Sequence, residues 1–176
     1  MLSIYRILTV ISFPVLITIG LLRRLINKEN NRSLLEKIFS FSKKKFNKKL
    51  NLIWFHGSSI GEITSVLPII HSILKKKKYK ILLTSNSITS GNLINEKLGN
   101  KVFHQYLPLD LPHLNKKFLN KWSPKCAIFI DSEIWPNFIY EIKKRKIKLI
   151  LINARITNKS FRRWKYFYNF GKKVFS

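Results

Sequence analysis

Acidic side chains are scarce in this sequence, and three of them follow short apolar runs. The chain has 8 Asp and Glu residues against 34 Lys and Arg. Glu62, Asp131 and Glu133 each come soon after such a run. If the runs are parallel strands, the three carboxylates should lie on one edge of a sheet. A carboxylate there could act as a general base that takes a proton from a hydroxyl. Glu62 could instead only stabilise the start of the next helix, by about 0.3–1 kcal/mol.

Small and polar residues fill the loops that leave these apolar runs. The loop at 56–62 contains two glycines, which permit a tight turn with exposed backbone N–H groups. The loop at 84–91 is rich in hydroxyl side chains, which suit a sugar or a phosphate but are also common in turns that bind nothing. The residues we expect at a binding surface are Ser58, Ser59, Gly61, Ser85, Thr89, Ser90, Gly91, Glu133, Trp135, Asn137 and Arg155.

The sequence contains none of the common cofactor motifs. It has no GxxxxGK[ST] phosphate loop, and residues 56–61 lack the full dinucleotide fingerprint. Its four histidines show no metal-ligand spacing such as HExxH, and His56 is interpreted as a core or loop histidine. The single Cys126 excludes an intramolecular disulfide and is compatible with a reducing compartment. We therefore expect no metal and no cofactor.

The formal net charge of +26 predicts a strongly cationic surface. Such a surface attracts phosphates, which points to an anionic membrane or to nucleic acid. Two simpler explanations remain open. Lysine, isoleucine and asparagine share A/T-rich codons, so genome base composition could supply the lysines. The run at 75–78 also follows a helical pattern, where cations favour the negative end of a helix dipole.

The order of apolar runs and helical patterns predicts a doubly wound α/β unit with a mostly parallel sheet. Helical spacing of apolar residues is clearest at 63–74, where Pro68 predicts a kink. Further helices are expected at 111–120, 135–144 and 160–172. The expected strands lie at 52–55, 81–83, 102–106, 127–130 and 149–152.

An uncharged stretch of 16 residues, 7–22, lies near the start of the chain. As a helix it would reach roughly 24 Å, less than the roughly 30 Å hydrocarbon core of a bilayer. We expect a membrane-anchor helix within residues 1–24, either a marginal span or an interfacial helix, with the rest on the cytoplasmic side. A signal peptide or a buried helix are the alternatives. Residues 25–49 read as a basic amphipathic linker or helix that lies on the membrane or packs on the domain formed by 50–176.

Four ordered motifs lie between about residues 50 and 167: HGSSIGE at 56–62, YLPLDLP at 106–112, SEIWPN at 132–137 and NARI at 153–156. Their order and spacing resemble the N-terminal half of 3-deoxy-D-manno-octulosonic acid (Kdo) transferases. The resemblance implies a GT-B glycosyltransferase whose N-terminal domain is Rossmann-like. It also implies transfer of Kdo from CMP-Kdo to the lipid A precursor, on the cytoplasmic face of the inner membrane, in lipopolysaccharide synthesis.

The resemblance also assigns roles to residues. Glu62 matches the proposed base that deprotonates the acceptor sugar, and Glu133 matches a second carboxylate at the acceptor cleft. No metal is implied. The chain departs from the family pattern at Asn86 and Ile88, where a Met and a Pro are usual, but it keeps Thr84, Thr89 and Gly91.

The resemblance places the nucleotide donor in a second domain, which these 176 residues do not include. We therefore expect the polypeptide by itself to be inactive, because such transfer depends on positioning both partners. It would be a truncated product, a fragment, or one piece of a split enzyme that needs a separate CMP-binding half. Two other hypotheses are half of a different GT-B glycosyltransferase and a basic nucleic-acid-binding protein.

Overall fold

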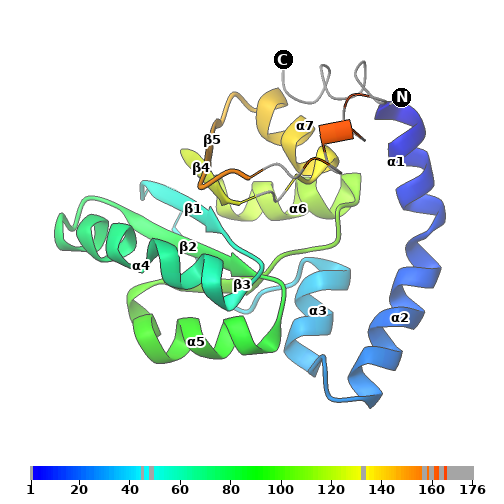
Figure 1. Cartoon of the computed structure of the whole chain (residues 1–176), viewed down its shortest axis with the longest axis horizontal. Coiled ribbons are helices and arrows are strands. Elements are labelled where there is room, and N and C mark those ends of the chain that lie inside the picture. The colour runs from blue at the N-terminus through cyan, green and yellow to red at the C-terminus, as the bar shows by residue number, and fades with distance from the viewer. Residues whose placement is uncertain are drawn as a thin grey trace.

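The computed structural model places five parallel strands in one sheet (Figure 1). It describes residues 2–44, 46–47, 50–131, 134–155, 158, 161–162 and 165. Every strand coincides with a predicted apolar run, so the predicted parallel sheet is confirmed. In spatial order the strands are β3 (Phe103–Tyr106), β2 (Lys80–Ser85), β1 (Leu52–His56), β4 (Cys126–Ile130) and β5 (Lys148–Ile152).

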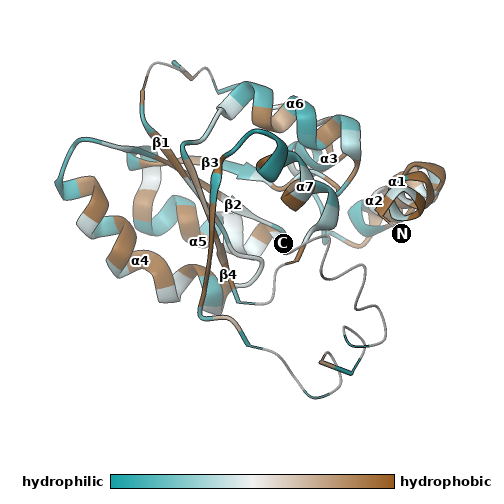
Figure 2. Ribbon diagram, turned by 90° about the horizontal axis from the view of Figure 1, so that it is seen from above, coloured by the Kyte–Doolittle hydropathy of each residue, from teal (hydrophilic) through white to brown (hydrophobic). Residues whose placement is uncertain are grey.

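Helices cover both faces of this sheet, as Figure 2 shows from above. Helices α4 (Ile60–Lys75) and α5 (Ile88–Leu98) pack on one face, and α6 (Pro112–Trp122) and α7 (Pro136–Lys144) pack on the other. Neighbouring residues of β1 face opposite layers: Trp54 packs with the α6 and α7 side chains, and Phe55 packs with those of α4 and α5. The predicted doubly wound arrangement is thus confirmed.

The predicted helices agree closely with the observed ones. The pattern at 63–74 becomes α4, which remains one helix through Pro68, and a short 3₁₀ helix, η1 (Gly99–Lys101), precedes β3. Serine side chains cap the N-termini of α4 and α5. Ser59 Oγ accepts a hydrogen bond from Glu62 N, and Ser87 Oγ accepts one from Ser90 N. Most of the helix predicted at 160–172 lies outside the described residues.

The predicted amphipathic segment contains α3 (Asn31–Phe39), which packs on the edge of the sheet. Arg32 Nη2 donates to His104 O (2.8 Å), and Tyr106 N donates to Glu36 Oε2 (2.7 Å). These two side chains satisfy backbone groups on the free side of β3. An unpaired edge is a template for association with other chains, so α3 protects it.

The apolar N-terminal stretch forms two helices, α1 (Leu2–Ile11) and α2 (Phe13–Leu25), in place of the single predicted helix. The pair is bent by 52° at Ser12, and neither helix alone is long enough and apolar enough to cross a membrane. The alternative of a buried helix is wrong, because Leu2 is the one buried residue of α1 and α2 has none. Length and composition would allow the bent pair as a broken span.

Asp110, in the loop between β3 and α6, joins several of these elements. Its carboxylate accepts hydrogen bonds from the backbone N–H groups of Asn137 (3.0 Å) and Phe138 (2.9 Å) at the start of α7. It also accepts from Asn115 Nδ2 in α6 (2.7 Å) and from Tyr5 OH in α1 (3.0 Å). Burial raises the pKa of Asp110, and the hydrogen bonds oppose that rise.

His104 is held neutral at the edge of the sheet. Burial lowers its pKa to about 3, and the positive charges of Arg32 and Lys44 add to the effect. Arg32 Nη2 lies 3.2 Å from Nδ1 and can only donate, so the ring proton is on Nε2, which donates to Ser85 Oγ at 3.0 Å.

This arrangement predicts a pH-dependent stability. The unfolded chain protonates His104 below about pH 6.5, whereas the folded protein keeps it neutral down to about pH 3. The free energy of unfolding should therefore fall in this window as the pH is lowered, by at most about 1.4 kcal/mol per pH unit. Urea unfolding of the full chain in detergent measures it. His104→Gln should flatten the slope and His71→Gln, at an exposed histidine, should not; an unchanged slope in His104→Gln would contradict this account.

Candidate functional site

The strand order creates an opening at the carboxyl ends of β1 and β4. The connection after β1 runs through α4 on one face, and the connection after β4 runs through α7 on the other. Ligands of doubly wound sheets bind at such a switch point. Here the residues that follow His56 and Ile130 border the opening, so two of the loops singled out in the sequence lie at the favoured position.

Glu62 lies in the first turn of α4, and its carboxylate is fixed by the loop before it. Its Oε2 accepts a hydrogen bond from Ser58 N (2.7 Å), and its Oε1 accepts one from Ser59 Oγ (2.6 Å). Ser59 Oγ in turn accepts from Glu62 N (3.2 Å). Ser59 is thus the N-cap of α4, and Glu62 supports the loop before the helix. Each carboxylate oxygen has further acceptor capacity, and the side chain is half-buried, so a substrate hydroxyl can still reach it.

The loop that holds Glu62 is itself tied to the next strand and to α3. Asn86 Nδ2 donates to Ser58 Oγ (2.5 Å), and Ser90 Oγ donates to Ser58 O (3.2 Å). Lys37 Nζ donates to Asn86 O (2.7 Å) and to Glu29 Oε1 (2.5 Å). Burial lowers the pKa of Lys37, and the nearby Glu29 carboxylate opposes that change.

Lys37 and Asn86 are supporting residues that sequence analysis did not identify. Asn86 stood out there only as a departure from the family pattern. The polar run around it gave a weak signal that could have suggested a contact with the first loop. Nothing in the sequence connected Lys37 with Glu62, because their relation depends on how α3 packs on the sheet.

The two glycines of the first loop differ in their surroundings, and neither has a positive φ. A Cβ on Gly57 would lie 3.1–3.2 Å from atoms of Ile130, Ile63 and Glu62, so these side chains would have to shift by a few tenths of an ångström to admit it. A Cβ on Gly61 would meet nothing nearer than Ser59 Oγ at 4.0 Å. The space beside Gly61 and Glu62 is therefore open to a ligand.

The second loop divides into exposed and buried residues. Thr89 is exposed, and its Oγ1 lies 3.0 Å from Ser87 Oγ. Ser85 and Ser90 are fully buried. Gly91 is also buried, and a Cβ there would lie 2.5 Å from Tyr106 OH, so this glycine lets α5 approach β3. The structure thus gives Ser85, Ser90 and Gly91 packing roles behind the loop surface.

Trp135 lies near the end of β1. Its ring centroid is 6.4 Å from that of His56, which is fully buried and whose Nδ1 lies 3.0 Å from Thr84 Oγ1. The next predicted residue, Asn137, is buried and donates through Nδ2 to Asp110 O at 2.5 Å. Glu133 lies outside the described residues, as does Ser132.

Asp131 and Arg155 lie on the same edge of the sheet as Glu62. Asp131 follows β4, has φ = 60°, and donates its backbone N–H to Ile152 O in β5 (2.9 Å). Arg155 comes three residues after β5 and is exposed. Among the described residues, no three His, Cys, Asp or Glu side chains are grouped so that they could hold a metal ion.

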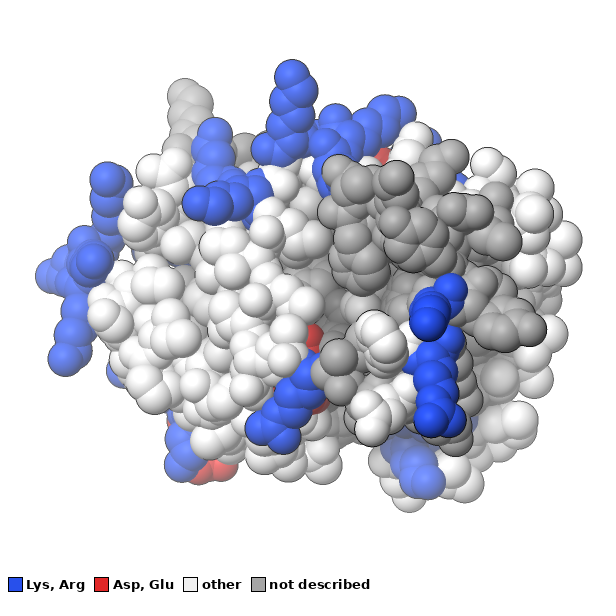
Figure 3. All heavy atoms as spheres, turned by 45° about the horizontal axis from the view of Figure 1, so that its top comes forward, with Lys and Arg blue, Asp and Glu red and all other residues white. Residues whose placement is uncertain are grey.

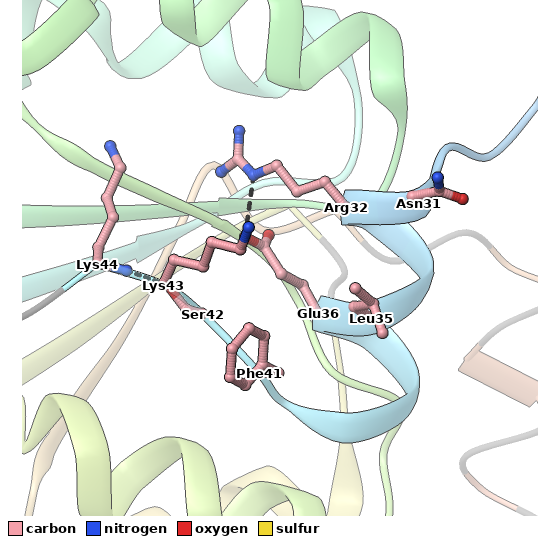
Figure 4. Close-up of a pocket in the computed structure, with 8 residues that line it drawn as sticks. All are labelled: Asn31, Arg32, Leu35, Glu36, Phe41, Ser42, Lys43 and Lys44. Atoms are coloured by element: carbon pink, nitrogen blue, oxygen red, sulfur yellow. Dashed lines mark hydrogen bonds and ion pairs between the residues drawn. The ribbon is translucent and has the colours of Figure 1, made fainter.

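A separate hollow of about 440 Å³ lies where α3 meets the edge of β3 (Figure 4). Arg32, Lys43 and Lys44 line it together with Glu36 and Phe41. Two of these side chains, Arg32 and Glu36, also bind backbone groups of β3. Figure 3 shows Lys and Arg side chains spread over one face of the molecule without a single dense patch.

Comparisons with known proteins give a consistent result. The family described as 3-Deoxy-D-manno-octulosonic-acid transferase (kdotransferase) matches residues 32–176. The 3-deoxy-D-manno-octulosonic acid transferase of Rickettsia bellii is 37% identical over 166 residues, which cover 94% of this chain and 39% of that protein. The Rickettsia typhi transferase is 44% identical over 115 residues, 65% of this chain and 25% of that protein.

A plant protein matches the same share of this chain as the Rickettsia typhi transferase. The probable mitochondrial 3-deoxy-D-manno-octulosonic acid transferase of Arabidopsis thaliana is 39% identical over 115 residues, 65% of this chain and 26% of that protein. The matches thus span about a quarter to two fifths of the length of these relatives. With the family match over most of its length, the chain belongs to the 3-deoxy-D-manno-octulosonic acid transferase family.

Proposed function

We propose that this chain supplies the acceptor-binding half of a glycosyltransferase that moves Kdo from CMP-Kdo to the lipid A precursor. Family membership supports the reaction class. The observation that carries the proposal is the position of Glu62 at the switch point, with its carboxylate fixed by Ser58 N and Ser59 Oγ beside the open space at Gly61. A base for a sugar hydroxyl needs this combination of fixed position and access.

In the proposed step, Glu62 takes the proton from an acceptor hydroxyl. The hydroxyl oxygen then forms a bond to the anomeric carbon of Kdo, and the bond between that carbon and the phosphate of CMP breaks. CMP leaves with the bonding electron pair, and the proton on Glu62 is later released to solvent. Ser59, Thr89, Trp135 and Arg155 lie at the same edge of the sheet and are proposed to contact the acceptor, together with Glu133.

The donor would be held by a second, nucleotide-binding half. We propose that the 176-residue polypeptide by itself does not transfer sugar, because Glu62 needs an activated donor positioned opposite it. The proposed location is the cytoplasmic face of the inner membrane, where the lipid acceptor is available. A net charge of +26 supports attraction to such a surface, by about 1 kcal/mol for each well-placed basic residue.

Replacement of the proposed base tests this function. Glu62→Gln keeps the shape of the side chain and an acceptor for Ser58 N, but it cannot take a proton. In an assay of this chain combined with a nucleotide-binding half of the family, the transfer rate should fall about 10²–10⁴-fold, while acceptor binding persists. Glu96→Gln, at an exposed glutamate of α5, is the control. Full activity in Glu62→Gln would rule out Glu62 as the base. If the combined halves transferred sugar only from a nucleotide sugar other than CMP-Kdo, the proposed donor would be wrong.

Two glycine substitutions distinguish a glycine proposed to border the acceptor, Gly61, from one that packs inside the domain, Gly91. Gly61→Ala fits without a clash and removes a flexible helix residue, so stability should stay equal or rise by up to about 1 kcal/mol. Transfer should nevertheless fall, since the methyl group enters the space proposed for the acceptor. Gly91→Ala should instead lower the melting temperature, because its Cβ would overlap Tyr106 OH. Unchanged transfer in Gly61→Ala would argue against an acceptor at this position.

A further inference from the structure

The outward side of the N-terminal helix pair is a continuous apolar stripe. Ten of the nineteen large apolar side chains that are exposed among the described residues belong to α1 and α2. Ile4, Ile7, Leu8 and Ile11 follow one another at helical spacing, and Val15 continues the series beyond the bend. Figure 2 shows both helices at the margin of the molecule, with much of their ribbon coloured as hydrophobic.

The inward side of α1 carries polar groups that are bound to the domain. Tyr5 OH donates to the buried Asp110 carboxylate, and Arg6 Nη2 lies 3.7 Å from Oε1 of the buried Glu141. The Arg6 guanidinium also lies over the Tyr140 ring, 4.7 Å from its centroid. These contacts clamp α1 along α7 and the loop before α6.

The second helix is held by close packing. A Cβ on Gly20 would lie 3.0 Å from Leu34 Cδ2 and 3.7 Å from Ile38 Cδ1, so α2 approaches α3 closely at this glycine. Near the bend, the Phe13 ring meets the His113 ring edge-on, with centroids 5.7 Å apart. Both helices therefore run along the domain, as Figure 1 shows at its side.

This clamp conflicts with a helix that crosses the bilayer. At about 1.5 Å per residue, the 10 residues of α1 reach roughly 15 Å and the 13 of α2 roughly 20 Å, against a hydrocarbon core of roughly 30 Å. To span together, the helices would have to straighten at Ser12, and Tyr5 and Arg6 would have to leave Asp110 and Glu141. Two buried carboxylates would then lose partners.

We propose that α1 and α2 form an interfacial anchor that lies in the plane of an anionic bilayer and does not cross it. The apolar stripe lies at the boundary between headgroups and acyl chains, a depth that suits amphipathic helices. Arg24 and Lys28, exposed at and just after the end of α2, face the anionic headgroups. The inference deepens the proposed function, because it rests on the proposed membrane location, but it does not depend on which sugar is transferred.

Spin labels along the stripe test the geometry. Leu8→Cys, Val15→Cys and Leu22→Cys are made one at a time in a Cys126→Ser background of the full chain. These side chains are 59%, 60% and 55% exposed and are spaced by seven residues. On vesicles of phosphatidylethanolamine and phosphatidylglycerol, power saturation should place all three labels at one shallow depth, about 5–10 Å below the phosphates. The control Ile69→Cys, an exposed apolar residue of α4, should remain in water.

Two results would overturn the proposal. A label at Val15 near the bilayer midplane, with Leu8 and Leu22 near opposite surfaces, would show a spanning helix. Labels that stay as water-exposed as Ile69, or become shielded without vesicles through a second copy of the chain, would show that no membrane covers the stripe. No donor sugar is present, so a failed transfer assay leaves this result unaffected.

A variant of the clamp adds a second criterion. Tyr5→Phe combined with Arg6→Gln removes the contacts of α1 with Asp110 and Glu141. It keeps the hydrogen bond from Asn137 Nδ2 to Thr9 Oγ1 (3.3 Å) and the Gly20 contact of α2. The label at Leu8 should become more mobile, whereas the label at Leu22 should keep its mobility. Equal mobility at Leu8 with and without the Tyr5 and Arg6 contacts would show that these two contacts do not hold the anchor.

Discussion

Parallel strands that send their connections to opposite faces of a sheet leave an opening at their carboxyl ends, and the candidate site depends on this constraint. The connections after β1 and β4 leave the sheet on different sides, through α4 and α7. The loop after β1 therefore ends in a helix start that faces the opening. Glu62 occupies that start, and the donors Ser58 N and Ser59 Oγ hold its carboxylate in one position.

Contacts from α3 and from Asp110 hold the loops on the two sides of this opening. On one side, α3 covers the edge of β3 through Arg32 and Glu36, and Lys37 reaches Asn86, which holds Ser58. On the other side, Asp110 binds the first backbone N–H groups of α7, directly after the Trp135 segment. Because Asp110 also binds Tyr5, the same carboxylate connects the N-terminal helix pair with the start of α7.

Local patterns in the sequence predicted the sheet and the loop around Glu62 because apolar runs and helical spacing are local signals. They did not predict the bend at Ser12, since an uncharged stretch looks the same whether it is straight or folded along a domain. Ser85 and Gly91 resembled binding residues in the sequence, yet they pack against His104 and Tyr106. A hydroxyl or a glycine does not reveal by its type whether it faces a ligand or a neighbouring strand.

Hydrogen–deuterium exchange with and without a lipid A precursor in vesicles tests most directly whether the acceptor occupies the switch point. When the precursor is present, exchange should be slower at the backbone amides of residues 57–62, 134, 135 and 137, beyond any change caused by vesicles alone. Slower exchange confined to the α3 hollow around Arg32 and Lys44, with residues 57–62 unchanged, would contradict it.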